Sequence, residues 1–471
     1  MAPSRRDFLK HTGCALASAA AFAASLKRFG MISALAQSGA GNYKALVCIF
    51  LNGGNDGNNT VIPYDDYNNP GGYSAVRGGS QLAISQASLL QISPISAGGR
   101  RFGLHPSMVD MQTLFNQQKL AILCNTGTLL QPLTKSQYQT TPSARPYQLF
   151  SHSDQVTQQQ SSISNVPGDT GWGGRIADVM LGINGNAPLP MIVSLAGTNL
   201  FATGNVTRQL AISPAPTSLG NVLVLNGYSF PPSTDARSRA FDQIRGFDTE
   251  HTLVKASGDV YAQALQTAQA LSSSSSFEVT TTFPNTTLGN QLKQVARLIK
   301  ANLNQPALGL QRQVFFCQLG GFDHHSGQIN AQSNLLTQVS QAMKAFYDET
   351  VAQGVASQVT AFTMSDFGRT FQPAGSGAAA VGSDHAWGNH ALIVGGAVRG
   401  GDFYGAYPTL ALGGPDDTDS GSNPRGRWIP TTSLDQYAAT LATWFGLTSA
   451  QIPTVFPTIG RFATSNLGFL S

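Results

Sequence analysis

Apolar residues lie along this chain in short continuous runs, and a turn rich in Gly, Asn or Asp follows most of them. The clearest run is Lys44–Leu51, which leads into the turn Asn52–Gly57. Continuous apolar runs, unlike alternating ones, are typical of strands that are buried on both faces of a sheet. We predict strands at Lys44–Leu51, Leu120–Cys124, Pro190–Leu195, Val222–Leu225, Gln313–Leu319, Gln358–Met364 and Ala391–Val394.

Segments with a helical period of apolar residues lie between these runs. Three are clear, at residues 288–299, at residues 335–346 and at Leu434–Phe445. Thr432-Ser433 precedes the third as a helix cap, and Gly446 ends it. Alternating strands and helices predict an α/β fold with a largely parallel sheet that helices cover on both sides.

The first 36 residues form a segment of different character. Ser4–Lys10 (SRRDFLK) matches the twin-arginine signal, an Ala-rich apolar stretch follows at residues 14–26, and Ala34–Ala36 offers a cleavage site between small residues. We predict a signal peptide at residues 1–36 and export by the twin-arginine machinery to the periplasm or the extracellular space. The alternative interpretation is a basic N-terminus beside an ordinary helix.

The rest of the chain, residues 37–471, is predicted to be one large α/β domain. Its length exceeds that of an ordinary domain, but an α/β domain with insertions can reach it. Residues 130–310 are the least regular part, so we place insertions there, and the serine run Ser272–Ser276 is predicted to be a loop. No stretch after the leader reaches about 18 apolar residues, so we expect no stable membrane insertion.

Charge and cysteine content narrow the class of protein. The leader holds five of the 28 basic residues and one of the 24 acidic residues, so the remaining chain is balanced at 23 of each. A neutral chain has no electrostatic surplus for phosphates, which argues against nucleic acid as a partner. Cys48, Cys124 and Cys317 each lie in an apolar run, which predicts buried core thiols and neither a disulfide framework nor a metal cage.

Candidate chemistry gathers where the predicted strands end. Asp56, Asp323 and Asp366 each follow a strand by a few residues, and four histidines lie in the two motifs Phe322–His325 and Ser383–His390. In open α/β sheets, sites form at the carboxyl ends of strands. Carboxylates and imidazoles together bind divalent metals, and two ions can stabilise the attacking and leaving oxygens of a phosphoryl transfer.

Simpler interpretations of these residues remain. Asp56 is as well explained by a turn in a Gly/Asn-rich loop, and turn capping or a polar loop would account for the two histidine motifs. His105, before Pro106, is predicted to be a structural residue at a helix start, and His251 to lie on the surface. Arg175 and Arg369 are candidates for holding an anion or for a structural ion pair. The chain has no Gly-x-Ser-x-Gly, His-Glu-x-x-His or Gly-Lys-Ser/Thr loop motif.

Eight segments, taken as an ordered set, resemble the domain-of-unknown-function 1501 family, many of whose members carry a twin-arginine leader. They extend from residue 44 to about 465. The segments are Leu51–Asn59, Leu104–Pro106, Ser151–Gln155, Gly171–Arg175, Gly320–His325, Ser365–Thr370, Ser383–His385 and Arg425–Ser433.

This resemblance implies a fold and a nucleophile. The family is similar to the alkaline phosphatase and sulfatase superfamily, which implies a mixed, mostly parallel sheet sandwiched between helices, with metals at the carboxyl edge. Asp56 then takes the place of the Asp after the first strand. Ser151 becomes the candidate nucleophile, at a helix start where backbone amides can receive phosphate, with Ser153 as the alternative.

The resemblance also implies metal ligands. One ion would lie between Asp323, His325 and His385, and Asp366 would join Asp56 and Ser151 around a second. His324 is the alternative to His325, and His390 or Asp384 would replace a ligand that the superfamily has at Phe367. The predicted ligands are therefore Asp56, Asp323, His325, Asp366, Asp384 and His385. The metal could be zinc, manganese, magnesium or calcium.

Two functions are consistent with these patterns. The first is a periplasmic metal-dependent hydrolase of phosphate or sulfate esters, small or polymeric, in which Arg369 and His152 bind substrate. The alternative is a non-catalytic exported protein for binding or assembly that keeps the fold with a degenerate metal site. Convergence of the predicted ligands would favour the enzyme, and separation of Asp366 from Asp56 would favour the alternative.

Overall fold

The structure is a computed structural model that describes residues 42–223, 227–228, 234–272 and 277–471. The predicted signal peptide lies outside the described residues, as do parts of the predicted strand Val222–Leu225 and of the serine run. In the described part of the chain, no helix is both long enough and apolar enough to span a membrane.

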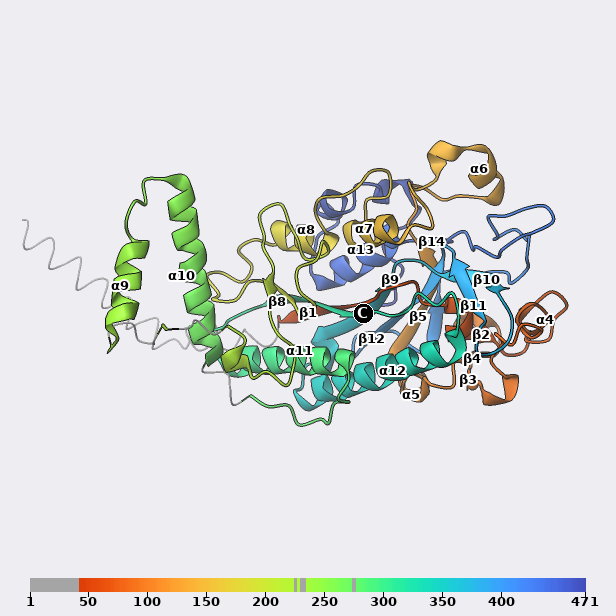
Figure 1. The fold of residues 1–471 in the computed structure, drawn as a ribbon, viewed down its shortest axis with the longest axis horizontal. Helices are drawn as coiled ribbons and strands as arrows, with labels where there is room; N and C mark the ends of the chain where they lie inside the picture. Colours follow the sequence, from red (N-terminus) through yellow and green to blue (C-terminus); the bar gives the residue numbers. More distant parts are fainter. Residues whose placement is uncertain (1–41, 224–226, 229–233, 273–276) are drawn as a thin grey trace, which may run out of the picture.

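A nine-stranded sheet forms the centre of the molecule (Figure 1). Its strands are β1 (Lys44–Leu51), β5 (Leu120–Gly127), β6 (Ile192–Ser194), β7 (Leu210–Ala211), β8 (Arg312–Leu319), β9 (Val359–Ser365), β12 (Asn389–Gly395), β13 (Asp402–Tyr404) and β14 (Thr432–Ser433). They follow the order β13-β5-β12-β9-β1-β8-β6-β7, with β14 also paired to β5. Only the pairings of β12, with β5 and β9, are antiparallel among those described. The predicted mixed, mostly parallel sheet is therefore confirmed.

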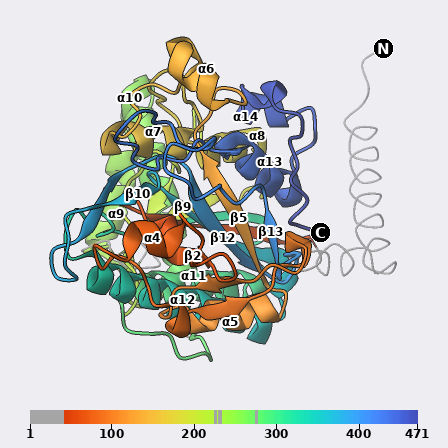
Figure 2. The same ribbon diagram turned by 90° about the vertical axis from the view of Figure 1, so that its right-hand side faces the viewer.

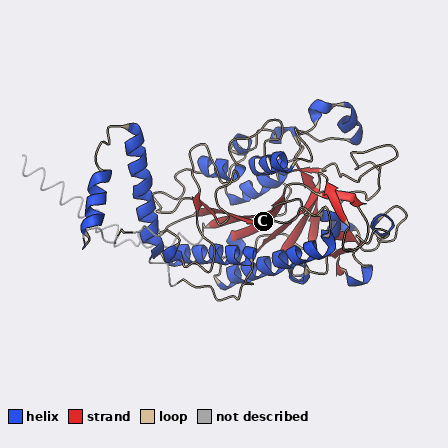
Figure 3. Ribbon diagram, in the orientation of Figure 1, coloured by secondary structure: helices blue, strands red, loops and turns tan. Residues whose placement is uncertain are grey.

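Helices cover both faces of this sheet, as the perpendicular view and the colouring by secondary structure show (Figures 2 and 3). One face is covered by α5 (Val109–Asn116), α11 (Thr287–Asn304) and α12 (Gln328–Ala352), and the other by α7 (His152–Ser161), α8 (Trp172–Val179), α13 (Leu434–Phe445) and α14 (Ile452–Val455). Along β1, Val47 and Ile49 join the core of the first face, whereas Cys48 and Phe50 join that of the second. Strand side chains alternate between faces, so a strand covered on both sides is apolar throughout.

Smaller elements surround this body. Two further sheets pair β10 (Arg369–Ala374) with β11 (Gly382–His385), and β4 (Phe102–Leu104) with both β2 (Val61–Pro63) and β3 (Leu90–Ile92). The remaining α-helices among the described residues are α3 (Gly57–Thr60), α4 (Tyr73–Arg77), α6 (Lys135–Thr140), α9 (Ala236–Arg245) and α10 (Thr252–Ser272). Helices α9 and α10 stand side by side at one end of the molecule, away from most of the sheet (Figure 1).

Most predicted elements are confirmed, and one is wrong. Six of the seven predicted segments contain a strand, and α13 has the predicted bounds, with a capping box at Ser433 and Gly446 at its end. Val222 and Leu223, by contrast, lie in a turn after a short 3-10 helix, where both pack half-buried against the core. In the described half of that run, the apolar residues reflect packing and not a strand. The three described cysteines are buried and free, as predicted.

Candidate metal centre

The carboxyl edge of the sheet brings together two of the predicted acids. Strands β8 and β9 both run parallel to β1 and flank it, so all three end at the same edge. The loop after β8 carries Asp323 and His325, and Asp366 directly follows β9. The sheet topology therefore places residues more than 40 positions apart at one site.

Two further elements complete the site from the sides. Strand β11 ends at His385, which pairs with Arg369 on β10. Helix α7 begins at His152, immediately after the cap residue Ser151. The rings of His152 and His385 lie against each other and against Phe367, with centroids 4.3–4.8 Å apart.

Three imidazoles converge on one carboxylate oxygen, Oδ1 of Asp323. The Nε2 atom of His325 lies 3.1 Å from it, that of His152 3.3 Å and that of His385 3.5 Å. The Nε2 atoms of His325 and His385 are themselves 3.0 Å apart. Among the described residues, His152, Asp323 and His385 form a group whose ligand atoms all lie within 4.8 Å of one another.

The other nitrogen of each ring is held by an acceptor outside the cluster. Nδ1 of His152 lies 2.7 Å from Oδ2 of Asp366, and Nδ1 of His325 lies 2.9 Å from Oδ1 of Asp384. Nδ1 of His385 lies 2.7 Å from the carbonyl oxygen of Phe150. Carboxylates and carbonyls only accept hydrogen bonds, so each Nδ1 carries a proton, and in the neutral imidazole each Nε2 then presents a lone pair. Metal-binding histidines are oriented in this way in proteins.

A cation would satisfy this arrangement. Nε2 of His152 is buried and has no hydrogen-bond partner. A tetrahedral zinc ion with bonds of about 2.0–2.1 Å places its ligand atoms about 3.3–3.4 Å apart. The distances of 3.1–3.5 Å from Asp323 Oδ1 to the three Nε2 atoms are close to that spacing. His325 nevertheless lies outside the group of His152, Asp323 and His385, whose ligand atoms are all within 4.8 Å of one another. The residues present therefore fit a divalent metal ion.

Charge at the centre is consistent with this fit. Partial burial alone would raise the pKa of Asp323, but the Arg369 guanidinium and the neighbouring imidazoles lower it to about 2. Asp323 is therefore ionised at neutral pH. The hydrogen bond to Asp366 raises the pKa of His152, whereas burial lowers that of His385. Asp323 and His325 are each 47% exposed, so the centre is accessible from solvent.

The turn after β1 contacts both Asp366 and the loop that carries Asp323. Asp366 is fully buried, and its Oδ1 accepts a hydrogen bond of 3.0 Å from the Gly53 amide. Gly53 has a φ of +114°, and a Cβ there would lie 2.5 Å from the backbone nitrogen of Asp323. Only glycine fits this close approach, which explains why the turn after β1 reads Asn-Gly-Gly.

Residues 43–418 match the family described as "Protein of unknown function (DUF1501)". The chain belongs to the DUF1501 family. All residues of the candidate centre, from His152 to His385, lie within the matched segment of this DUF1501 protein. A search of curated proteins finds no match.

Solved structures give only distant similarities. They include the PsFucS1 sulfatase from Pseudoalteromonas sp., with 8% identity, 91% of this chain and 71% of that chain covered and a TM-score of 0.33. They also include the C-terminal periplasmic domain of EcEptC from Escherichia coli in complex with Zn, with 10% identity, 75% and 73% covered and a TM-score of 0.30. TM-scores near 0.3 carry no argument about activity.

The candidate centre of this DUF1501 protein contains one residue, His152, that was not among the predicted metal ligands. His152, predicted to bind substrate, is the third imidazole of the cluster, and its ring lies tilted against that of Phe367 with centroids 4.7 Å apart. It is a candidate for the ligand position for which His390 and Asp384 had been considered. His390 is buried, with Nδ1 3.2 Å from the Asn125 amide and its ring stacked on Tyr407. The motif beginning at Ser151 was the only sequence signal for His152.

Two predicted ligands, Asp366 and Asp384, contact histidines of the cluster but are not part of it. Asp366 and Asp384 each hold the Nδ1 of a histidine and thus orient a ligand without converging on Asp323 Oδ1. Asp384 also forms an ion pair with Arg425. His325 and not His324 faces Asp323, which separates the two alternatives.

Asp56 does not join the cluster. It is buried against Arg77, whose Nη1 lies 2.6 Å from Oδ2, and it also accepts from Gln328 Nε2 at 2.5 Å and from the Asn58 amide at 3.0 Å. Its lone pairs are engaged by these donors, so the geometry does not support a second ion between Asp56 and Asp366. The predicted two-ion arrangement is replaced by one centre.

Arg369 and Ser151 occupy different positions from those expected. Arg369 is 1% exposed, and its guanidinium donates to Asp323 and to main-chain carbonyls, including those of Gly54 and Ser383. This geometry does not support substrate binding by Arg369. The Ser151 hydroxyl lies beside the cluster residue His152 and donates to Asp154 Oδ2 at 2.5 Å.

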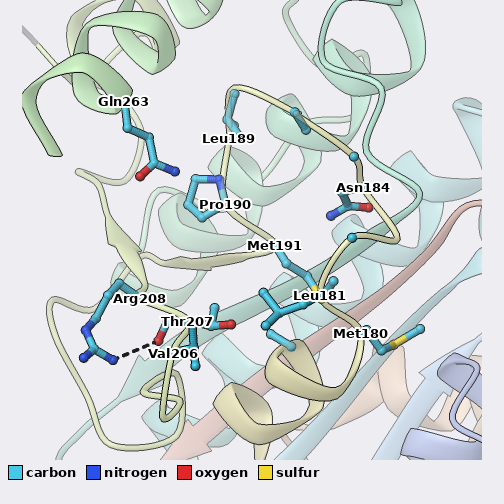
Figure 4. Close-up of a pocket in the computed structure, with 14 residues that line it drawn as sticks. Met180, Leu181, Asn184, Leu189, Pro190, Met191, Val206, Thr207, Arg208 and Gln263 are labelled. Carbon is cyan, nitrogen blue, oxygen red and sulfur yellow. Dashed lines mark hydrogen bonds between the residues drawn. The ribbon is translucent and has the colours of Figure 1, made fainter. Parts of the chain in front are cut away.

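A separate pocket lies at the opposite edge of the sheet (Figure 4). It is lined by Met180, Pro190, Met191, Arg208 and neighbouring residues. Met191 precedes β6, which runs parallel to β8, so this pocket borders the amino ends of these strands. The pocket therefore does not belong to the candidate centre.

Proposed function

We propose that this protein is an exported hydrolase of phosphate or sulfate esters that holds one divalent metal ion at His152, Asp323, His325 and His385. One observation carries the proposal. Three imidazole Nε2 atoms meet at a single Asp323 oxygen while each Nδ1 is anchored by an outside acceptor. Such convergence of unprotonated nitrogens is unfavourable without a cation between them.

The donor set favours zinc among the four metals considered. Imidazole nitrogens suit zinc and related transition metals, whereas magnesium and calcium prefer sites built from oxygen ligands. With three nitrogens and one carboxylate oxygen, the centre resembles neither a magnesium nor a calcium site. A bound ion would supply Lewis-acid stabilisation of the charge that develops on an ester oxygen.

Ser151 is the proposed nucleophile. Its hydroxyl makes no capping hydrogen bond to the α7 backbone and instead donates to Asp154 Oδ2. Asp154 can take that proton as Ser151 Oγ bonds to phosphorus or sulfur, and can pass it to the departing alkoxide to give the alcohol. Water then cleaves the Ser151 ester and releases phosphate or sulfate. The first amides of the ten-residue helix α7 face the same end and can receive oxyanion charge.

Metal analysis combined with ester assays tests this proposal. Purified mature protein should contain close to one zinc per chain and cleave an aryl phosphate or an aryl sulfate. His152→Ala and Asp323→Ala should lose both metal and activity, and Ser151→Ala should lose activity alone. The exposed His251→Ala is the matched control and should change neither. If Asp323→Ala holds as much metal as the wild type, the proposed metal centre is refuted.

A non-catalytic binding function is the second candidate, and one observation favours it. More than half of the large apolar side chains that are exposed in the described residues lie on the α9–α10 hairpin or its connection. These side chains are Phe241, Ile244, Phe247, Leu253, Val254, Val260 and Tyr261. Large exposed apolar patches often mark interaction sites. Retained metal with no hydrolysis of either ester would favour this function.

Export is part of the same proposal. It is supported by Arg5 and Arg6 in the twin-arginine motif. Assembly of the centre from three distant segments before transport would fit a pathway for folded proteins.

A further inference from the structure

A polar recess lies next to the metal centre and contains three arginines. Its walls include Tyr138, Arg145, Asp419, Arg425 and Arg427. These residues come from α6, from the turn after it and from the segment between β13 and β14. The arginines of the Arg-Gly-Arg-Trp motif, which the ester chemistry above does not use, are therefore gathered at one place.

The recess is joined to the centre by direct contacts. Arg425 pairs with Oδ2 of Asp384, whose Oδ1 holds His325. Arg427 Nε donates to the carbonyl oxygen of His385 at 3.2 Å. The Arg427 guanidinium also lies 4.5 Å from the ring of Phe150, whose carbonyl holds His385. A molecule in the recess would thus lie one residue away from two candidate ligands.

The guanidiniums keep donors that the protein does not use. Arg145 lies over the Tyr138 ring at 4.5 Å and donates through Nε and Nη2 to main-chain carbonyls. Within the described part of the chain, Arg145 Nη1 and both terminal nitrogens of Arg427 make no hydrogen bond to protein. Arg425 uses only Nη2 among its side-chain nitrogens. These groups are half-buried and fixed by their other contacts, so their free N–H groups are pre-oriented.

Charge in the recess is positive but partly balanced. Asp384 is engaged by Arg425 and His325. Asp419 accepts from the Arg425 amide at 3.0 Å and lies 3.8 Å from Arg427 Nη1. Three guanidiniums against two carboxylates leave one net positive charge. Forked guanidinium donors match the oxygens of sulfate and phosphate groups.

We propose that this recess binds a second sulfate or phosphate group, so that the substrate carries two such groups, one of them the ester at the metal centre. The inference rests on the proposed function for the identity of the reacting ester. The binding of the second group depends on Arg145, Arg425 and Arg427 and requires no metal. An uncharged substituent would leave these donors unpaired.

Calorimetric titration of the metal-stripped full chain tests the recess directly. The probes are a disaccharide with two sulfate groups, a disaccharide with two phosphate groups and the unmodified disaccharide. We expect at least one doubly charged sugar to bind, and the tighter of the two identifies the preferred oxyanion. Arg145→Gln and Arg427→Gln should each weaken binding about tenfold, since each removes a charge-assisted hydrogen bond.

The control is Arg100→Gln, an exposed arginine paired with Asp66, which should bind as the wild type does. Equal binding of the unmodified sugar, or unchanged affinity in both recess variants, would overturn the proposal. If Arg427→Gln does not fold, Arg145→Gln alone decides. If these variants bind the anion more weakly, but the wild-type protein holds no metal and cleaves neither ester, the recess is supported and the proposed function is refuted.

Discussion

Single residues of the same type have opposite roles here because their surroundings differ. Asp56 and Asp323 both follow central strands, but Asp56 is 2% exposed against Arg77 whereas Asp323 is 47% exposed among imidazoles. Both carboxylates pair with a buried guanidinium, that of Arg77 or of Arg369, but only Asp323 is also exposed beside imidazoles, where it can accept a metal ion. His152 and His390 differ similarly, since the buried Nε2 of His152 has no hydrogen-bond partner, whereas Nδ1 of His390 accepts from the Asn125 amide.

Asp56→Asn should therefore destabilise the fold without removing the metal. Loss of one partner leaves Arg77 as an uncompensated buried charge, which costs about 3–5 kcal/mol. Urea unfolding and metal analysis of the same preparation measure the two effects. Asp66→Asn, which breaks an exposed pair with Arg100, should cost about 1 kcal/mol or less. A metal-free Asp56→Asn protein of normal stability would instead identify Asp56 as a ligand.

At the scale of elements, helix and strand ends determine where the functional side chains lie. Helix α7 begins where its first residue reaches the centre, and β11 ends at His385 in register with Arg369. Helix α8 illustrates the same principle in a structural role. Asp178 lies in its last turn, where a negative charge is unfavourable for the helix dipole, yet it accepts hydrogen bonds from the amides of Asn205, Val206 and Thr207.

This loop contact should depend on pH. Partial burial would raise the pKa of Asp178, but the amide donors outweigh it, and the pKa lies below the ordinary value of 3.8. A lowered folded-state pKa stabilises the protein above pH 3.8, and that contribution is lost as the pH falls through the folded value. The difference in free energy of unfolding between wild type and Asp178→Asn should therefore be smaller at pH 3 than at pH 7. An equal difference at both values would contradict the assignment.

At the scale of the whole molecule, the candidate centre exists only in the folded chain. Its four proposed ligands lie between residues 152 and 385 and reach one point from three segments: the start of α7, the loop after β8 and the end of β11. A ligand that binds only this assembled state shifts the unfolding equilibrium toward it.

Removal of the metal should therefore lower the melting temperature. Free metal at 100 times its Kd contributes about 2.7 kcal/mol to the free energy of unfolding. Calorimetric melts before and after chelation, and after return of zinc or magnesium, measure the effect. Zinc should restore the melting temperature, magnesium should not, and His152→Ala should show no change on chelation. A chelator-induced shift that persists in His152→Ala would place the metal elsewhere.

The sequence by itself determined the central strands, the helix periods and the buried cysteines, because these follow from local periodicity. The grouping of Asp323 and His325 with His385 was implied by the resemblance to the family. The sequence did not determine that Val222 lies in a turn, that His152 is the third imidazole or that Asp56 pairs with Arg77. Those outcomes depend on which donors from distant segments already occupy each lone pair. Only the tertiary structure brings these donors into contact, so it alone separated the ligands from the residues that hold them in place.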